Sequence, residues 1–173
     1  PIEVRLGCAL EADQLPQFLA REYFDVVVTA VGAKASIPPI PGVERETVYK
    51  AGDIFEGFDY SRLGRSVVII GAGKVGMEAA WLLADQGKQV HVVESMPEVL
   101  PGDHPSIRAT LLLQLEERCV KVAPGCKVTQ ILDGAVFVEK DGEELQLPAD
   151  SVLLAVGYQA DDSLYRTALN SSC

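Results

Sequence analysis

The sequence has few of the features that mark nucleic-acid-binding or membrane proteins. Its 173 residues include 15 Lys and Arg against 25 Asp and Glu, a net charge of -10, so it lacks the cations that displace counterions from nucleic-acid phosphates. The same charge disfavours binding to an anionic membrane surface. No apolar run approaches the ~20 residues that cross a bilayer, and residues 1–5 are unlike a secretory signal. We therefore expect a cytoplasmic protein that binds neither nucleic acid nor membrane.

Cysteine is scarce too, and its spacing argues against redox or metal chemistry. None of the cysteines forms a CxxC or CxxxxC pair, which a redox dithiol or a zinc site normally shows. We interpret them as reduced thiols that pack as small apolar groups. No Ser/His/Asp or Cys/His arrangement has a recognisable spacing, so we predict no catalytic residue and no metal ligand. The four cysteines are Cys8, Cys119, Cys126 and Cys173.

The overall composition is typical of one compact globular domain. Hydrophobic residues make up 48% of the chain and charged residues 23%, an ordinary balance for a soluble fold. A chain of this length buries roughly 70% of the surface that it exposes when unfolded. A substantial core is therefore expected.

The clearest pattern lies in the middle of the chain. The segment at residues 66–70, apolar from Val67 to Ile70, is typical of a buried parallel strand, and a glycine-rich turn follows at 71–76. Helical spacing of apolar residues then extends over 75–86, and a second strand over 89–94. Together these segments predict one βαβ unit.

Downstream of this unit the alternation of strands and helices is interrupted. We expect a helix at 106–118 with Ser106 as its N-cap, and a short strand at 119–123. Asp-Gly pairs, a strong hairpin signal, separate the next strands, and an apolar run at 151–156 predicts a return to the parallel sheet. The hairpin strands are expected at 127–132, 135–140 and 144–147. The sequence thus predicts an α/β fold, a Rossmann-like parallel sheet with helices on both faces, plus an antiparallel three-stranded meander.

The N-terminal part predicts less regular structure. We expect a weak strand at 2–7, a helix at 11–21 and a buried strand at 25–31. The proline cluster at 38–41 indicates an extended crossing segment, because proline cannot continue the interior of a sheet. A short helical segment is expected at 53–57.

The turn after the first central strand has the pattern GxGxxG, which in this context is typical of a dinucleotide-binding site. Gly71 permits a tight turn, and Gly73 lets a pyrophosphate approach the backbone. Gly76 and Ala80 let the helix pack closely on the sheet. The start of the helix presents unpaired N–H groups and a partial positive charge to the pyrophosphate. The predicted contacts are Gly71, Ala72, Gly73, Lys74, Val75 and Gly76.

An acidic residue, Glu94, ends the second central strand. A carboxylate at this position accepts hydrogen bonds from the adenosine ribose hydroxyls and repels a 2′-phosphate. The next residues, Ser95, Met96 and Pro97, include no arginine that would accept such a phosphate. We therefore predict NAD(H) rather than NADP(H) as the ligand. Lys74 either contacts the phosphates or lies exposed in solvent.

Several segments resemble the FAD-dependent pyridine nucleotide-disulfide oxidoreductase superfamily, over nearly the whole chain. They are TAVG at 29–32, Ile40-Pro41-Gly42, VVIIGAGKVGMEAA at 67–80, HVVE at 91–94 and ADSVLLAVGYQADD at 149–162. In that superfamily an NAD domain is inserted into an FAD domain, and the resemblance implies that the GxGxxG here is the NAD motif. It further implies that Glu78 and the turn Ala155-Val156-Gly157 lie near the nicotinamide.

The resemblance also implies a division of the chain. Residues 1–48 would be part of an FAD-domain lobe with its linker, 49–160 the NAD(H)-binding domain, and 161–173 a return towards the FAD domain. The chain would then be a piece of a longer protein, with an FAD-binding GxGxxG upstream and a Gly-Asp flavin motif downstream. The rest of the FAD domain would be its partner. The isolated piece would bind nucleotide without turnover.

Val4–Gly7 and Asp161–Tyr165 fit one group in particular, the 2,4-dienoyl-CoA reductases, trimethylamine dehydrogenases and old-yellow-enzyme-like NADH oxidases. Membership would imply FMN and an iron–sulfur cluster further upstream. Two alternatives stay open. One is a vestigial module that binds ADP or nothing and serves structure, and the other is that the glycine motif binds FAD.

Overall fold

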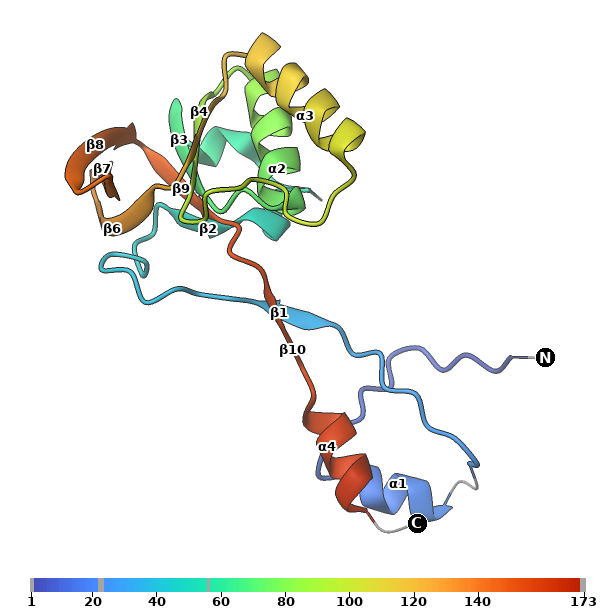
Figure 1. Ribbon diagram of the computed structural model, residues 1–173. Coiled ribbons are helices and arrows are strands. Elements are labelled where there is room, and N and C mark those ends of the chain that lie inside the picture. Colours follow the sequence, from blue (N-terminus) through green and yellow to red (C-terminus); the bar gives the residue numbers. More distant parts are fainter. Residues whose placement is uncertain (1, 22–23, 56, 172–173) are drawn as a thin grey trace. The chain divides into compact units, whose positions relative to one another are not determined.

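The computed structural model describes residues 2–21, 24–55 and 57–171 (Figure 1). The chain forms two compact units. One comprises residues 35–158, and the other combines residues 1–34 with 159–173. The assignment of these units to NAD(H)- and FAD-binding lobes stays a prediction.

A five-stranded parallel sheet organises the unit of residues 35–158. Its strands follow the order β2-β9-β3-β4-β5, and the neighbouring strands β3 and β4 are the two strands of the predicted βαβ unit. Branched apolar residues fill β3 and β9, as expected for strands that are covered on both faces. The strands are β2 (Val48–Lys50), β3 (Ser66–Ile70), β4 (Gln89–Glu94), β5 (Lys121–Pro124) and β9 (Ser151–Leu154). The predicted α/β class is confirmed.

The two faces of this sheet are covered by different elements (Figure 1). Helices α2 (Lys74–Asp85) and α3 (Pro105–Glu117) pack on one face, in a buried cluster that includes Met77, Leu83 and Leu115. Two short 3-10 helices, η1 (Ala51–Ile54) and η2 (Tyr60–Arg62), join this layer.

The predicted meander forms the layer on the opposite face. It consists of β6 (Lys127–Leu132), β7 (Gly134–Lys140) and β8 (Glu143–Ala149), paired antiparallel. Its inward residues, among them Val128, Ile131 and Val136, pack in a second buried cluster with Val68 and Val152 of the sheet. The expectation of helices on both faces is therefore wrong, because the apolar face of the meander already covers this one.

Two element boundaries differ from the sequence expectation for local reasons. The N-cap of α3 is His104, whose Nδ1 accepts from the Ser106 N–H, while Pro105 supplies the first helical residue. The predicted cap at Ser106 is thus wrong. After α3, Cys119 has a φ of 59°, which ends the helix and delays β5 to Lys121. Cys119 and Cys8 are exposed, so only Cys126 packs as a buried thiol among the cysteines of the described residues.

The other unit contains α1 (Leu15–Arg21) and α4 (Ser163–Asn170), which pack against each other. Strands β1 (Ala33–Ala35) and β10 (Tyr158–Ala160), where the chain passes between the units, form a two-stranded sheet. The structure places α1 later than the expected start at residue 11.

The strands expected at 2–7 and 25–31 are absent from the described residues. The valines of the second segment are exposed, Val26 by 77% and Val28 by 83%. An apolar run becomes a buried strand only when neighbouring strands pair with it. Among the described residues no strand lies along 25–31, so its composition alone did not determine its conformation.

His91 gives the folded unit a pH dependence. It lies half-buried on β4, and desolvation, with a smaller contribution from Lys121, lowers its pKa below 6.5. In the unfolded chain His91 binds a proton near pH 6.5, whereas in the folded chain it does so only at a lower pH. The free energy of unfolding is therefore greatest above pH 6.5 and falls as the pH drops towards the lowered pKa of the folded chain. We expect urea midpoints at pH 5.5 to lie below those at pH 7.5, and a His91→Gln variant to lose part of this difference. An equal difference in both proteins would contradict the role of His91.

Candidate functional site

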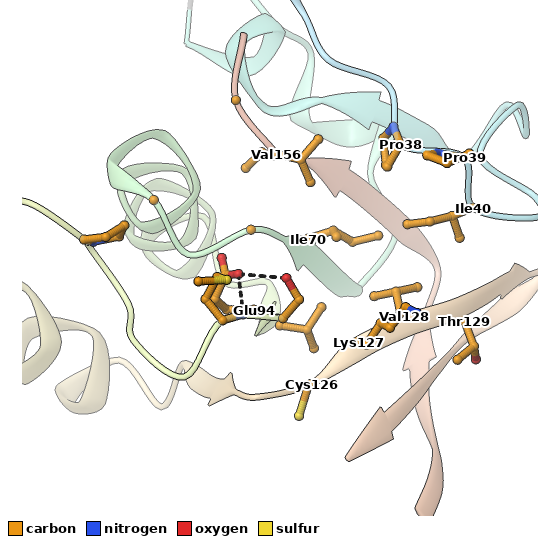
Figure 2. A pocket seen from close by; sticks show the side chains of 18 of the residues that line it. Pro38, Pro39, Ile40, Ile70, Glu94, Cys126, Lys127, Val128, Thr129 and Val156 are labelled. Carbon is orange, nitrogen blue, oxygen red and sulfur yellow. Dashed lines mark hydrogen bonds between the residues drawn. The ribbon is translucent and has the colours of Figure 1, made fainter. Parts of the chain in front are cut away.

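A cleft of about 840 Å³ opens at the carboxyl ends of the parallel strands (Figure 2). From β3 the sheet continues through β4 and β5 on one side, whereas β9 and β2 lie on the other side of β3, so the strand order reverses at β3. Ligands of open α/β sheets bind at such a reversal of strand order, in pockets of this size. The cleft lies entirely within residues 35–158. Its lining residues are Pro38–Pro41, Ile70, Gly71, Gly73, Val93–Met96, Glu98, Pro101, Cys126–Thr129 and Ala155–Gly157.

The glycine-rich turn between β3 and α2 forms the floor of this cleft. Gly71 has a φ of 108°, and a Cβ there would lie 2.5 Å from the carbonyl oxygen of Ala155. A Cβ at Gly76 would collide with the carbonyl oxygen of Gly71. At Gly73, by contrast, an added Cβ would meet no atom within 4 Å. Two of the glycines are therefore needed for close backbone packing, and the third faces open space in the cleft.

Helix α2 starts at the cleft with its first N–H groups unpaired. Gly73 is the N-cap, without a side-chain hydrogen bond, and the first bond of the helix runs from the Met77 N–H to the Gly73 carbonyl at 3.0 Å. The N–H groups of Lys74, Val75 and Gly76 therefore have no partner within the helix. Such a helix start binds anions, because these donors and the helix dipole both favour negative charge.

Glu94 ends β4 beside this turn and faces it. Its Oε2 accepts from the Ala72 N–H at 2.8 Å. Its Oε1 accepts from the Met96 N–H at 2.9 Å and the Ser95 hydroxyl at 3.2 Å (Figure 2). A carboxylate offers about four acceptor sites. One site is free, and the Ser95 hydroxyl frees a second when it rotates, so a pair of ligand hydroxyls can be accepted.

The structure brings together most of the predicted site residues. Gly71, Gly73, Glu94 and the turn Ala155-Val156-Gly157 all line the cleft. Ala72, Val75 and Gly76 form the turn and the start of α2 behind them.

Two predicted residues lie elsewhere. Lys74 is exposed and does not line the cleft, which fits the solvent alternative. Glu78 lines a smaller hollow between α2 and α3, together with Trp81 and Ile107.

Some lining residues had no functional signal in the sequence. The proline segment at 38–41, which the sequence predicts only as a crossing segment, forms one wall of the cleft. Residues 126–129, at the start of the meander, form another wall of the cleft, and Cys126 and Val128 among them are buried (Figure 2). These positions depend on how the meander folds onto the sheet, which no local motif records.

Metal-binding and membrane-spanning features are absent from the described part of the chain. No group of three or more His, Cys, Asp or Glu residues there is placed to hold a metal ion. No helix in that part has the length and apolar character needed to span a bilayer.

Comparison with known proteins adds a family to this geometry. A family model described as pyridine nucleotide-disulphide oxidoreductase matches residues 19–173. Among curated proteins, the chain is 37% identical over 156 residues to a bilirubin reductase of Mediterraneibacter gnavus, covering 90% of this chain and 23% of that protein. It is 31% identical over 159 residues to an NADH oxidase of Thermoanaerobacter brockii, covering 90% and 24%.

Solved structures agree. A 2-naphthoyl-CoA reductase in complex with 2-naphthoyl-CoA superposes with a TM-score of 0.81 at 28% identity, over 96% of this chain and 24% of that one. The 6-hydroxypseudooxynicotine amine oxidase of Pseudomonas geniculata N1 gives a TM-score of 0.78 at 26% identity, over 95% and 26%. The chain thus spans about a quarter of the length of these relatives.

The contrast between two glycines is testable by substitution. Gly73→Ala places its methyl group in open space at an ordinary φ of -75°, so we expect stability between unchanged and about 1 kcal/mol higher. Gly76→Ala pushes a methyl group against the Gly71 carbonyl and should cost about 1–3 kcal/mol. Urea unfolding of both variants checks the order. A Gly73→Ala protein that is the less stable of the two would contradict this geometry.

Proposed function

Because the chain belongs to the pyridine nucleotide-disulphide oxidoreductase family, we propose that its cleft binds the dinucleotide NAD(H). The observation that supports this most directly is the Glu94 carboxylate facing the unpaired start of α2. A dinucleotide has the matching chemistry, a dianionic pyrophosphate next to a ribose with two hydroxyls. The glycine turn leaves space for the first, and the carboxylate accepts from the second.

The lining residues suggest how the ligand lies. The pyrophosphate is expected at Gly73 and the first turn of α2, and the adenosine ribose at Glu94. The nicotinamide is then expected towards Ala155-Val156-Gly157, where Val156 is 38% exposed. When bound, the nicotinamide supplies a hydride for a flavin, and the residues of this chain bind and orient it.

The charges of the cleft favour NAD(H) over NADP(H). Its lining contains two carboxylates, Glu94 and Glu98, and one cation, Lys127. A 2′-phosphate next to the Glu94 carboxylate would meet like charge, which raises the free energy of binding.

A second candidate ligand is FAD. The family is flavin-dependent, and the ADP half of FAD has the same pyrophosphate and ribose as NAD(H), so the family match fits either dinucleotide. Calorimetric titration of the purified chain with NADH, NADPH, ADP and FAD separates these proposals. Tightest binding of NADH supports the first, and a yellow protein that retains flavin supports the second. Equal affinity for ADP and NADH indicates a vestigial site that recognises only the ADP half.

The chain is proposed to work as part of a longer flavoenzyme. It spans about a quarter of its relatives' length, and the exposed valines at 26–28 are suited to burial against further strands. We infer that the rest of an FAD domain covers them. The similarity to reductases and an NADH oxidase favours the dienoyl-CoA reductase-like group, whose other parts would supply FMN and an iron–sulfur cluster. The isolated chain is then expected to bind nucleotide without turnover.

Removing the Glu94 carboxylate should weaken binding strongly. A hydrogen bond to a charged group contributes ~1.5–3 kcal/mol, so Glu94→Ala is expected to reduce NADH affinity roughly 10- to 150-fold, at ~1.4 kcal/mol per tenfold. Glu94→Gln is the matched variant, because it keeps an acceptor for the Ala72 N–H but loses the charge. Glu94→Gln should reduce the difference in affinity between NADH and NADPH. Unchanged NADH affinity in Glu94→Ala would reject the ribose role.

Gly73 offers an independent test of where the pyrophosphate lies. A methyl group there fills the open space of the cleft while the protein stays folded, so Gly73→Ala should weaken NADH and ADP by a similar factor, at least tenfold if the close approach is lost. Isothermal titration measures both ligands. The urea midpoint of Gly73→Ala, measured on the same preparation, is the control that separates a loss of affinity from a loss of folded protein. Full NADH affinity in Gly73→Ala would place the phosphates elsewhere.

A further inference from the structure

The segment that follows β4 runs along the cleft and returns to the glycine turn at Leu100. Ser95, Met96 and Pro101 of this segment line the cleft. Leu100 lies between Met96 and Pro101 in the sequence, and its N–H donates to the Ala72 carbonyl at 2.8 Å. Ala72 is thus held on both sides, because its own N–H donates to the Glu94 carboxylate.

Leu100 makes this bond from an unusual conformation. Its φ is 51°, in the left-handed region that residues other than glycine rarely adopt. Its side chain is only 2% exposed and packs in the cluster that contains Met77 and Leu111. A strained backbone of this kind persists only where the surroundings fix it, and here the buried side chain does so.

The direction of this bond affects Gly73. The peptide between Ala72 and Gly73 is planar and trans, so its carbonyl and its N–H point in opposite directions. Because Leu100 holds the carbonyl, the Gly73 N–H points away from Leu100. Gly73 lines the cleft, and among the described residues no acceptor takes up its N–H.

We propose that Leu100 is a positioning residue for the pyrophosphate. Its backbone N–H, held in place by the buried side chain, orients the Ala72–Gly73 peptide so that the Gly73 N–H is ready to donate to a phosphate oxygen. The inference rests on the proposed nucleotide site and adds to it a residue that lies outside the GxGxxG motif.

Replacing Leu100 by its α-hydroxy acid through nonsense suppression tests this directly. The resulting ester keeps the side chain and removes the N–H, and it also makes the Val99 carbonyl a weaker acceptor for Arg108 Nη1, which lies outside the cleft lining. A typical neutral hydrogen bond corresponds to roughly a 3- to 10-fold change in affinity, so ADP and inorganic pyrophosphate should bind about that much more weakly. In amide NMR, the Gly73 signal should shift downfield on ADP binding in the wild-type chain and shift less in the ester. The matched control is the same ester at Val120, whose N–H donates to Leu115 at 2.9 Å outside the cleft.

A second pair of variants covers the case in which the ester protein unfolds. Leu100→Gly keeps the N–H and relaxes the left-handed strain but removes the side chain that fixes it, so ADP affinity should fall and the Gly73 amide should exchange faster. Leu63→Ala is the control, because Leu63 is buried just before β3, at the amino end of the sheet and away from the cleft, and it should leave ADP affinity unchanged.

The outcomes separate the inference from the proposed function. If the wild-type chain binds ADP and both Leu100 variants bind it equally well, the role of Leu100 is overturned and the nucleotide site stands. If the wild-type chain binds neither ADP nor pyrophosphate, both are overturned. Weaker binding in the Leu100 variants, with unchanged affinity in the Val120 ester and Leu63→Ala, supports the inference.

Discussion

The site depends on one interaction, the hydrogen bond from the Ala72 N–H to the Glu94 carboxylate at 2.8 Å. It joins the turn after β3 to the end of β4, two neighbouring strands whose register aligns Ile70 with Val93. Without it, the glycine turn would lack its link to the acidic residue that gives the cleft its chemistry. The carboxylate thus has two functions, since it fixes the turn and offers its free acceptor sites to a ligand.

The sequence predicted this centre because its signals are local. Continuous apolar runs, a glycine turn and helical spacing act within about thirty residues, and the structure confirms the βαβ unit almost to the residue. The Asp-Gly pairs located the meander for the same reason. The position of Glu94 beside the turn follows from parallel pairing of β3 and β4, so it too could be inferred before the structure was known.

What the sequence did not predict depends on contacts between distant segments. The run at 25–31 has the composition of a buried strand, but no described strand pairs with it. The meander covers a sheet face that helices were expected to cover, and it thereby adds Cys126 and Val128 to the cleft. No sequence pattern indicated the role of Leu100. Its left-handed backbone is stabilised by the burial of its side chain, which only the folded structure shows.

Two features at the cleft lower the stability of the folded unit. Leu100 has a strained backbone, and the first N–H groups of α2 lack partners within the helix. A structural module gains nothing from such a combination, whereas a ligand that accepts from those N–H groups offsets it. We interpret this local cost at the cleft as support for the proposed ligand site.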